Sequence, residues 1–138
     1  MYRKILVAYD GSKQGKKAFD AAVDMAERDG AELVVLSVVR PPEIADDVEI
    51  EGVIENSRSY HRRMLAELKP RLKERKVKSH LEVAVGHPAE QIIYRADKHE
   101  ADLIVLGDRG HSKFRRILLG SVTKQVTEHA DRAVLVIR

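Results

Sequence analysis

The segment LIVLGDRGHSKFRRILLGSVTKQV, residues 103–126, decides the fold that this chain is predicted to adopt. Its apolar start, residues 103–106, has the length and composition of a strand that is buried on both faces. Three glycines come next in the chain: Gly107, Gly110 and Gly120. Ser121 then opens a helix that is predicted to end near residue 129. A strand, a glycine-rich loop and a helix in this order indicate an α/β protein.

The same alternation of strand-like and helix-like segments extends over the whole chain. Apolar runs of strand length occupy residues 5–9, 33–39, 81–85, 103–106 and 133–137. Between the first two, Ser12 and Gly30 are expected to cap a helix at its two ends. The alternation predicts a five-stranded parallel sheet with about four helices on both faces.

Two details of the remaining helices depend on proline. The second helix is predicted to begin near Ile54 and to be bent or interrupted by Pro70, which lacks an N–H. The third is predicted to begin at Pro88, where proline suits the first helical position. The acidic stretch before the second helix, residues 43–51, has no clear period and is predicted to be a loop.

Composition limits the possible classes of protein. A chain of 138 residues, 43% hydrophobic and 34% charged, fits one globular domain over residues 1–138 rather than a disordered segment. It contains no apolar run long enough to span a membrane and no secretory signal, so a cytoplasmic location and no membrane partner are expected. A net charge of +3 and an aromatic content of 4% argue against nucleic acid as a partner.

Several kinds of catalytic or metal site are disfavoured. The absence of cysteine excludes disulfides and thiolate ligands. The histidines include no pair four residues apart and no HExxH motif, which argues against a zinc site; they are His61, His80, His87, His99, His111 and His129. Ser121 does not lie in a nucleophile elbow, and no Gly-Lys-Ser/Thr sequence follows the glycines.

A ligand site is expected beyond the carboxyl ends of the strands, as in other open parallel sheets. Asp10 with Gly11 and Ser12 follows the first strand, and the glycine-rich segment follows the fourth. Backbone N–H groups of glycines and of a helix N-terminus can surround a phosphate, so the sequence predicts an anion-binding site there. Asp10 could also serve only as a helix cap. The basic side chains of the loop either neutralise a phosphate chain or are simply solvated: Arg109, His111, Lys113, Arg115 and Arg116.

The glycine pattern, Gly107-x2-Gly110-x9-Gly120-Ser121, resembles that of the universal stress protein family. Residues 5–12 (ILVAYDGS), 86–89 (GHPA) and 129–136 (HADRAVLV) add to the resemblance, which covers essentially the whole chain. The resemblance implies a Rossmann-like three-layer fold with strand order 3-2-1-4-5. It also implies a homodimer through the last strand, Ala133 to Ile137.

The glycine pattern is similar to that of the family members that bind ATP, and the resemblance assigns roles to particular positions. Ala8 and Val38 would line the adenine pocket, and Asp10 would meet the ribose or the adenosine side. The phosphates would be held by Gly107, Gly110, Gly120 and Ser121, with Val122 and Thr123. Mg²⁺ or Mn²⁺ would be carried by the phosphates rather than by a protein cage. No residue is assigned a catalytic role or a direct metal contact.

The leading hypothesis is an ATP-binding regulatory protein of the stress response that acts on an unidentified protein partner. One alternative is a slow ATPase or phosphotransferase in which Asp10 or Asp108 orients water or metal. Another is an interaction module that binds AMP or no nucleotide. The sequence shows a phosphate cradle but no convincing catalytic base, so at most weak hydrolysis is expected.

Overall fold

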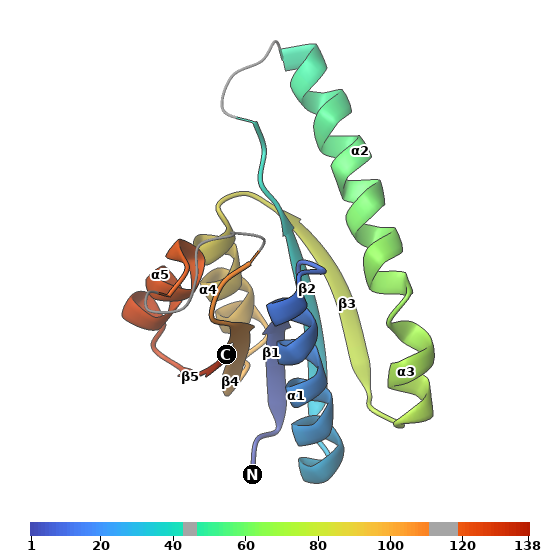
Figure 1. Ribbon diagram of the computed structural model, residues 1–138, viewed down its shortest axis with the longest axis vertical. Helices are drawn as coiled ribbons and strands as arrows, with labels where there is room; N and C mark the ends of the chain where they lie inside the picture. The colour runs from blue at the N-terminus through green and yellow to red at the C-terminus, as the bar shows by residue number, and fades with distance from the viewer. Residues whose placement is uncertain (43–46, 111–118) are drawn as a thin grey trace.

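The computed structural model describes residues 1–42, 47–110 and 119–138 of the chain (Figure 1). Its elements are β1 (Lys4–Ala8), α1 (Lys13–Asp29), β2 (Glu32–Val39), α2 (Asp47–Ala66), α3 (Lys69–Glu74), β3 (Ser79–Val85), α4 (Pro88–Lys98), β4 (Leu103–Gly107), α5 (Ser121–His129) and β5 (Ala133–Ile137). No helix in these ranges is long and apolar enough to cross a membrane.

The five strands form one parallel sheet in the order β3-β2-β1-β4-β5, which confirms the predicted topology. β1 is the central strand and pairs Leu6 with Val34 of β2 and with Ile104 of β4. Because all strands are parallel, their carboxyl ends meet at one edge of the sheet. β2 lies on one side of β1 and β4 on the other, so the chain order reverses beside β1. A site is expected at this point of the edge.

Two hydrophobic clusters cover the two faces of the sheet, so the fold has three layers. Successive strand residues point to opposite faces, and Ile5 and Val7 contact one cluster while Leu6 contacts the other. The first cluster contains Phe19 of α1 together with side chains of α2 and α3. The second contains Ile92 of α4 with side chains of α5. Figure 1 shows α1 on one side of the sheet and α4 and α5 on the other.

Both predicted caps of α1 are present. The Ser12 hydroxyl accepts a hydrogen bond from the backbone N–H of Gly15, and Gly30 adopts the left-handed conformation at φ 67° that a C-terminal cap requires. α1 therefore begins immediately after the loop that follows β1. This fixes the position of Asp10 relative to the helix.

The second helix differs from the prediction. Residues 43–46 of the predicted loop lie outside the described residues, but α2 begins at Asp47 rather than near Ile54. The start was missed because residues 51–53 are exposed and show no apolar period. Pro70 interrupts the helix as predicted: α2 ends at Ala66, and α3 carries the proline in its first turn.

Candidate functional site

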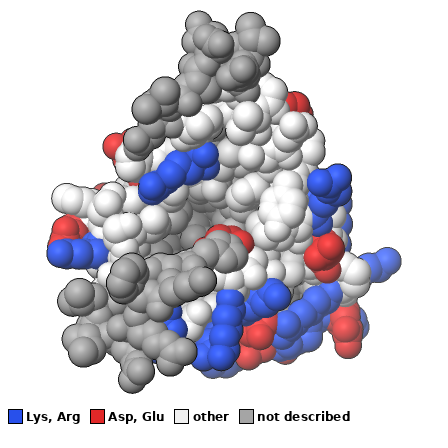
Figure 2. Space-filling view, turned by 45° about the horizontal axis from the view of Figure 1, so that its top comes forward, with Lys and Arg blue, Asp and Glu red and all other residues white. Residues whose placement is uncertain are grey.

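A cavity of about 650 Å³ lies at the carboxyl edge of the sheet, within the size range of small-molecule sites. Figure 2 shows it as a hollow with acidic atoms at its floor and basic atoms on its rim. The described residues around it are Ala8, Tyr9, Asp10, Gly15, Leu36, Val38, Arg40, Tyr60, His61, Pro88, Ile92, Leu106, Gly107, Arg109, Gly110, Val122 and Thr123. They come from the three central strands and from helices on both faces of the sheet.

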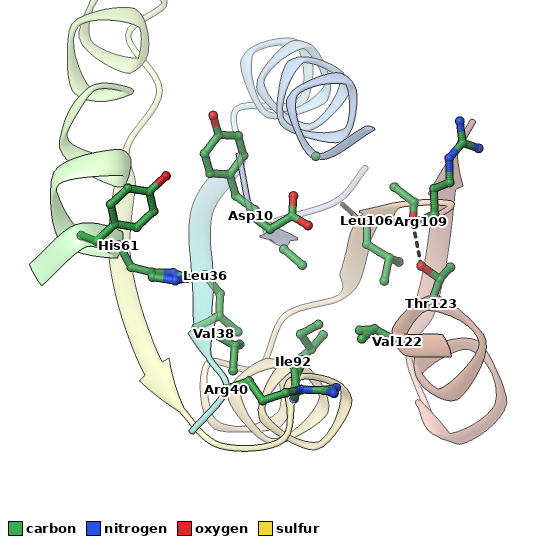
Figure 3. A pocket seen from close by; sticks show the side chains of 17 residues that line it. Asp10, Leu36, Val38, Arg40, His61, Ile92, Leu106, Arg109, Val122 and Thr123 are labelled. Carbon is green, nitrogen blue, oxygen red and sulfur yellow. Dashed lines mark hydrogen bonds between the residues drawn. The ribbon is translucent and has the colours of Figure 1, made fainter. Parts of the chain in front are cut away.

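Asp10 lies in the middle of the cavity (Figure 3) and is held in place by its neighbours. Its Oδ1 accepts hydrogen bonds from the Ser12 N–H at 2.9 Å and from the Ser12 hydroxyl at 2.5 Å. A Cβ on Gly15 would lie 2.6 Å from Oδ1, and one on Gly110 would lie 2.6 Å from Oδ2. The carboxylate therefore fits between two glycines, where any larger residue would displace it.

Residues of β4 and α5 form a second side of the cavity. The Thr123 hydroxyl donates a hydrogen bond of 2.7 Å to the carbonyl oxygen of Gly107, which joins the first turn of α5 to the end of β4 (Figure 3). α5 begins at Ser121, so Val122 and Thr123 bring the helix N-terminus to the cavity. The N–H groups of a first helical turn have no partner within the helix and favour an anion.

The opposite side of the cavity is largely apolar, with the Arg40 side chain beside Val38 and Ile92 (Figure 3). Leu36 and Val38 of β2 and Ile92 of α4 lie together there (Figure 3). Tyr60 and His61 of α2 reach the cavity from the other face of the sheet. A ligand in this cavity could therefore place an apolar group against the hydrophobic surface on one side of Asp10. It could place an anionic group at the helix N-terminus on the other side.

The surroundings of His61 favour its neutral form. Burial lowers its pKa below the ordinary 6.5, although the nearby carboxylate of Asp10 raises it in part. A hydrogen bond of 2.5 Å joins its Nδ1 to the hydroxyl of Ser37, which is buried in β2. The imidazole therefore attaches α2 to the sheet at the wall of the cavity.

The His61→Gln variant is expected to lose part of the acid sensitivity of folding. Because the folded state lowers the pKa of His61, the unfolded chain takes up the proton first, and the contribution of His61 to stability is complete above pH 6.5 and falls as the pH drops below that value. Urea unfolding at pH 7.5 and pH 5.5 measures the difference. His87→Gln, at the exposed start of α4, is the control and should keep the full difference. Equal differences in the wild type and in His61→Gln would contradict this assignment.

The acidic and basic groups near the glycines partly neutralise each other. Asp108 is 4% exposed, and its Oδ2 lies 3.2 Å from Nη1 of Arg109. Arg109 lines the cavity, whereas Asp108 is not among the described residues that do. The carboxylate of Asp108 is therefore paired with a cation. The other basic residues of the predicted loop, His111, Lys113, Arg115 and Arg116, lie outside the described residues.

The structure places most of the predicted site residues around this one cavity. Those that line it are Ala8, Asp10, Val38, Gly107, Gly110, Val122 and Thr123. Gly120 and Ser121 do not line it: Gly120 caps α5 and donates its N–H to the carbonyl oxygen of Asp108 at 2.8 Å, and Ser121 is exposed. Both residues therefore belong to the start of α5 rather than to the cavity wall.

Sequence reasoning missed other residues of the cavity wall. Arg40 follows the end of β2 just as Asp10 follows β1, so the same rule could have found it. Gly15 is a small residue in the first turn of α1, which is a weak signal of close packing. Tyr60 and His61 gave no signal, because their place in the cavity depends on how α2 packs across the sheet.

A parallel sheet with helices on both faces and a cavity beyond its carboxyl edge defines the doubly wound α/β class, in which ligands bind at that edge of the sheet. The chain belongs to the universal stress protein family, whose family model matches residues 1–138. Universal stress protein YxiE of Bacillus subtilis is 32% identical over 157 aligned residues, which cover 100% of both chains.

Solved structures agree with this assignment. Universal stress protein UspA from Lactobacillus plantarum has a TM-score of 0.91 and 30% identity, covering 99% of this chain and 98% of its own. A universal stress protein solved in complex with cAMP has a TM-score of 0.76 and 25% identity, covering 99% of this chain and 97% of its own. The family thus includes a protein of this fold with an adenine nucleotide bound.

Proposed function

We propose that this protein binds ATP in the cavity at the carboxyl edge of the sheet and acts as a nucleotide-dependent regulator in the stress response. One observation carries the proposal: an apolar wall and a helix N-terminus face the same cavity from opposite sides, with Asp10 between them. A nucleotide has the same order of parts, which are a base, a ribose and phosphates. The universal stress protein solved with cAMP supports the same ligand class.

The base and ribose have suitable partners on this chain. Leu36, Val38 and Ile92 offer an apolar surface for the adenine, with Ala8 at the end of β1 beside them. The carboxylate of Asp10 is positioned by Ser12, and carboxylate oxygens can accept hydrogen bonds from ribose hydroxyls. This assignment makes Asp10 a positioning group for the sugar.

The phosphates would lie against the glycines and the start of α5. A Cβ on Gly107 or Gly110 would come within 2.8 Å of a neighbouring atom, so the chain packs closely at these positions only because they are glycine. The first-turn N–H groups of α5 supply partial positive charge, and Arg109, which also pairs with Asp108, adds a guanidinium at the cavity wall. Gly120 and Ser121 would act by fixing this helix N-terminus.

A divalent cation would be held mainly by the nucleotide. Asp10 is the single carboxylate among the described residues that line the cavity, and its Oδ1 already accepts two hydrogen bonds. Mg²⁺ takes few protein carboxylates when phosphates are present, so this donor set fits Mg²⁺ or Mn²⁺ bound through the phosphates. The cation would neutralise phosphate charge there.

Calorimetric titration of nucleotide-stripped protein with ATP and Mg²⁺, with AMP in parallel, tests the proposal. Saturable binding near one ATP per chain is the expected result. A ligand that binds only the folded state must also raise its thermal stability. No heat and no thermal stabilisation with either nucleotide would overturn the proposal. Turnover that disappears in Asp10→Ala would instead favour a slow ATPase.

We also propose a homodimer formed through β5. This strand lies at one edge of the described sheet, and Val134 to Ile137 are partly rather than fully buried in the single chain. An apolar edge strand invites pairing with a second copy about a twofold axis. Light scattering is expected to give the mass of two chains, and a monomer at high micromolar concentration would contradict this.

A further inference from the structure

β3 is an outer strand of the described sheet, and it carries two side chains of types that can bind a metal ion. His80 and Glu82 are two residues apart on β3, so they point to the same face of the sheet. His99 is the C-terminal cap of α4, the helix that packs on this face. The fold therefore brings together two histidines that are nineteen residues apart in the chain.

The distances in this cluster match the spacing of metal ligands. Nε2 of His80 lies 3.4 Å and Nε2 of His99 lies 3.3 Å from Oε1 of Glu82. Ligand atoms around a tetrahedral zinc ion, with bonds of about 2.0–2.1 Å, are about 3.3–3.4 Å apart. Charge-assisted hydrogen bonds are ordinarily shorter, at about 2.7–2.9 Å.

The two imidazoles complete the cluster. All three ligand atoms lie within 4.8 Å of one another, and the two ring centroids are 5.5 Å apart with the planes inclined by 52°. His80 is exposed, so its side chain can rotate toward His99 at little cost in packing. A rotation about its side-chain bonds would bring Nε2 of His80 to the same distance from Nε2 of His99 as the two imidazoles now have from Glu82.

We propose that His80, Glu82 and His99 form a binding site for one Zn²⁺ ion. Two imidazole nitrogens and one carboxylate oxygen are a ligand set that zinc accepts, with a fourth position left for water or another donor. The side chain of His80 is 52% exposed, against 15% for Glu82 and 20% for His99, so the fourth position faces solvent. The ion would tie the edge strand β3 to the end of α4.

Arg95 also lies beside the cluster and pairs with Glu82. Its Nη1 lies 3.5 Å from Oε2 of Glu82. Nε2 of His99 lies 3.2 Å from the same oxygen and 3.3 Å from Oε1, whereas Nε2 of His80 approaches Oε1. Oε1 is therefore the oxygen that both imidazoles reach and that Arg95 does not contact, so the ion would bind there.

This site is separate from the cavity and does not depend on the proposed nucleotide. None of the three ligands is among the described residues that line the cavity. The expectation from spacing along the chain argued against zinc because it could detect only ligands close in sequence. A test of zinc binding therefore gives the same answer whether or not the protein binds ATP.

Titration of the untagged, nucleotide-free protein with ZnCl₂ by calorimetry is the test. The expected result is one saturable site per chain, with affinity reduced at least tenfold in His99→Ala and in Glu82→Gln. Co²⁺ provides a second readout, because its visible absorption reports tetrahedral coordination by nitrogen and oxygen. Zn²⁺ should also raise the unfolding temperature of the wild type and not that of His99→Ala.

His87→Ala is the matched control, because His87 is exposed at the other end of α4 and belongs to no cluster in the described residues. It should bind Zn²⁺ as the wild type does. Circular dichroism without metal checks that each variant is folded, and Glu82→Gln keeps the size of the side chain. Equal Zn²⁺ affinity in the wild type, His99→Ala and Glu82→Gln, or no saturable binding, would overturn the proposal and leave an ion-pair cluster.

Discussion

The Gly110→Ala variant is expected to bind ATP about 10- to 100-fold more weakly than the wild type. The added Cβ would lie 2.6 Å from Oδ2 of Asp10, so the carboxylate must move from the position that Ser12 gives it. A hydrogen bond to a charged group is worth about 1.5–3 kcal/mol, which corresponds to this loss of affinity. Calorimetric titration with ATP and Mg²⁺ measures it.

The free energy of unfolding of Gly110→Ala should also fall, by no more than about 1.5–3 kcal/mol, because the displaced carboxylate weakens its hydrogen bonds with Ser12. ATP affinity is therefore measured where the variant is fully folded. Gly52→Ala is the matched control: Gly52 lies in α2 with no atom within 4 Å of the added Cβ. It should bind ATP normally and gain up to about 1 kcal/mol of stability from its better helix propensity. Unchanged ATP affinity in Gly110→Ala would contradict the role given to Asp10.

The Gly107→Ala variant is expected to be less stable than the wild type by about 1–3 kcal/mol, the usual cost of overpacking a core. A Cβ at this position would lie 2.8 Å from Cβ of Gln14 and 3.0 Å from its backbone carbon and oxygen. Gln14 is buried in the first turn of α1, next to the Ser12 cap, so the helix backbone itself must shift. Urea unfolding measures the change in the free energy of unfolding.

This expectation separates two roles of the glycine pattern. Gly107 allows β4 and α1 to approach closely, whereas Gly110 makes room for Asp10. ATP affinity of Gly107→Ala, measured where the variant is fully folded, should fall as well, because α1 holds the loop that carries Asp10. Unchanged stability with lost ATP binding would assign Gly107 to the ligand alone.

Much of the fold could be predicted because its signals are local. Short apolar runs located all five strands, and Ser12 and Gly30 located both ends of α1. The start of α2 was predicted wrongly because the prediction used the same local signal. Hydrophobic period reveals only buried faces, and residues 51–53 are exposed and show no such period. A helix whose first turns lack a buried face cannot be recognised by its period.

The sequence by itself determined the order of strands and helices and the edge of the sheet at which the cavity opens. It also identified Asp10 and the glycines as candidate site residues. These follow from hydrophobic period, capping residues and the geometry of parallel strands, all of which act over a few residues. Only the tertiary structure decided that His61 joins the cavity wall through Ser37, that Gly15 and Gly110 enclose Asp10, and that His80 and His99 meet at Glu82. These contacts join elements far apart in the chain, and their geometry is fixed by the packing of helices on the sheet, for which no local pattern exists.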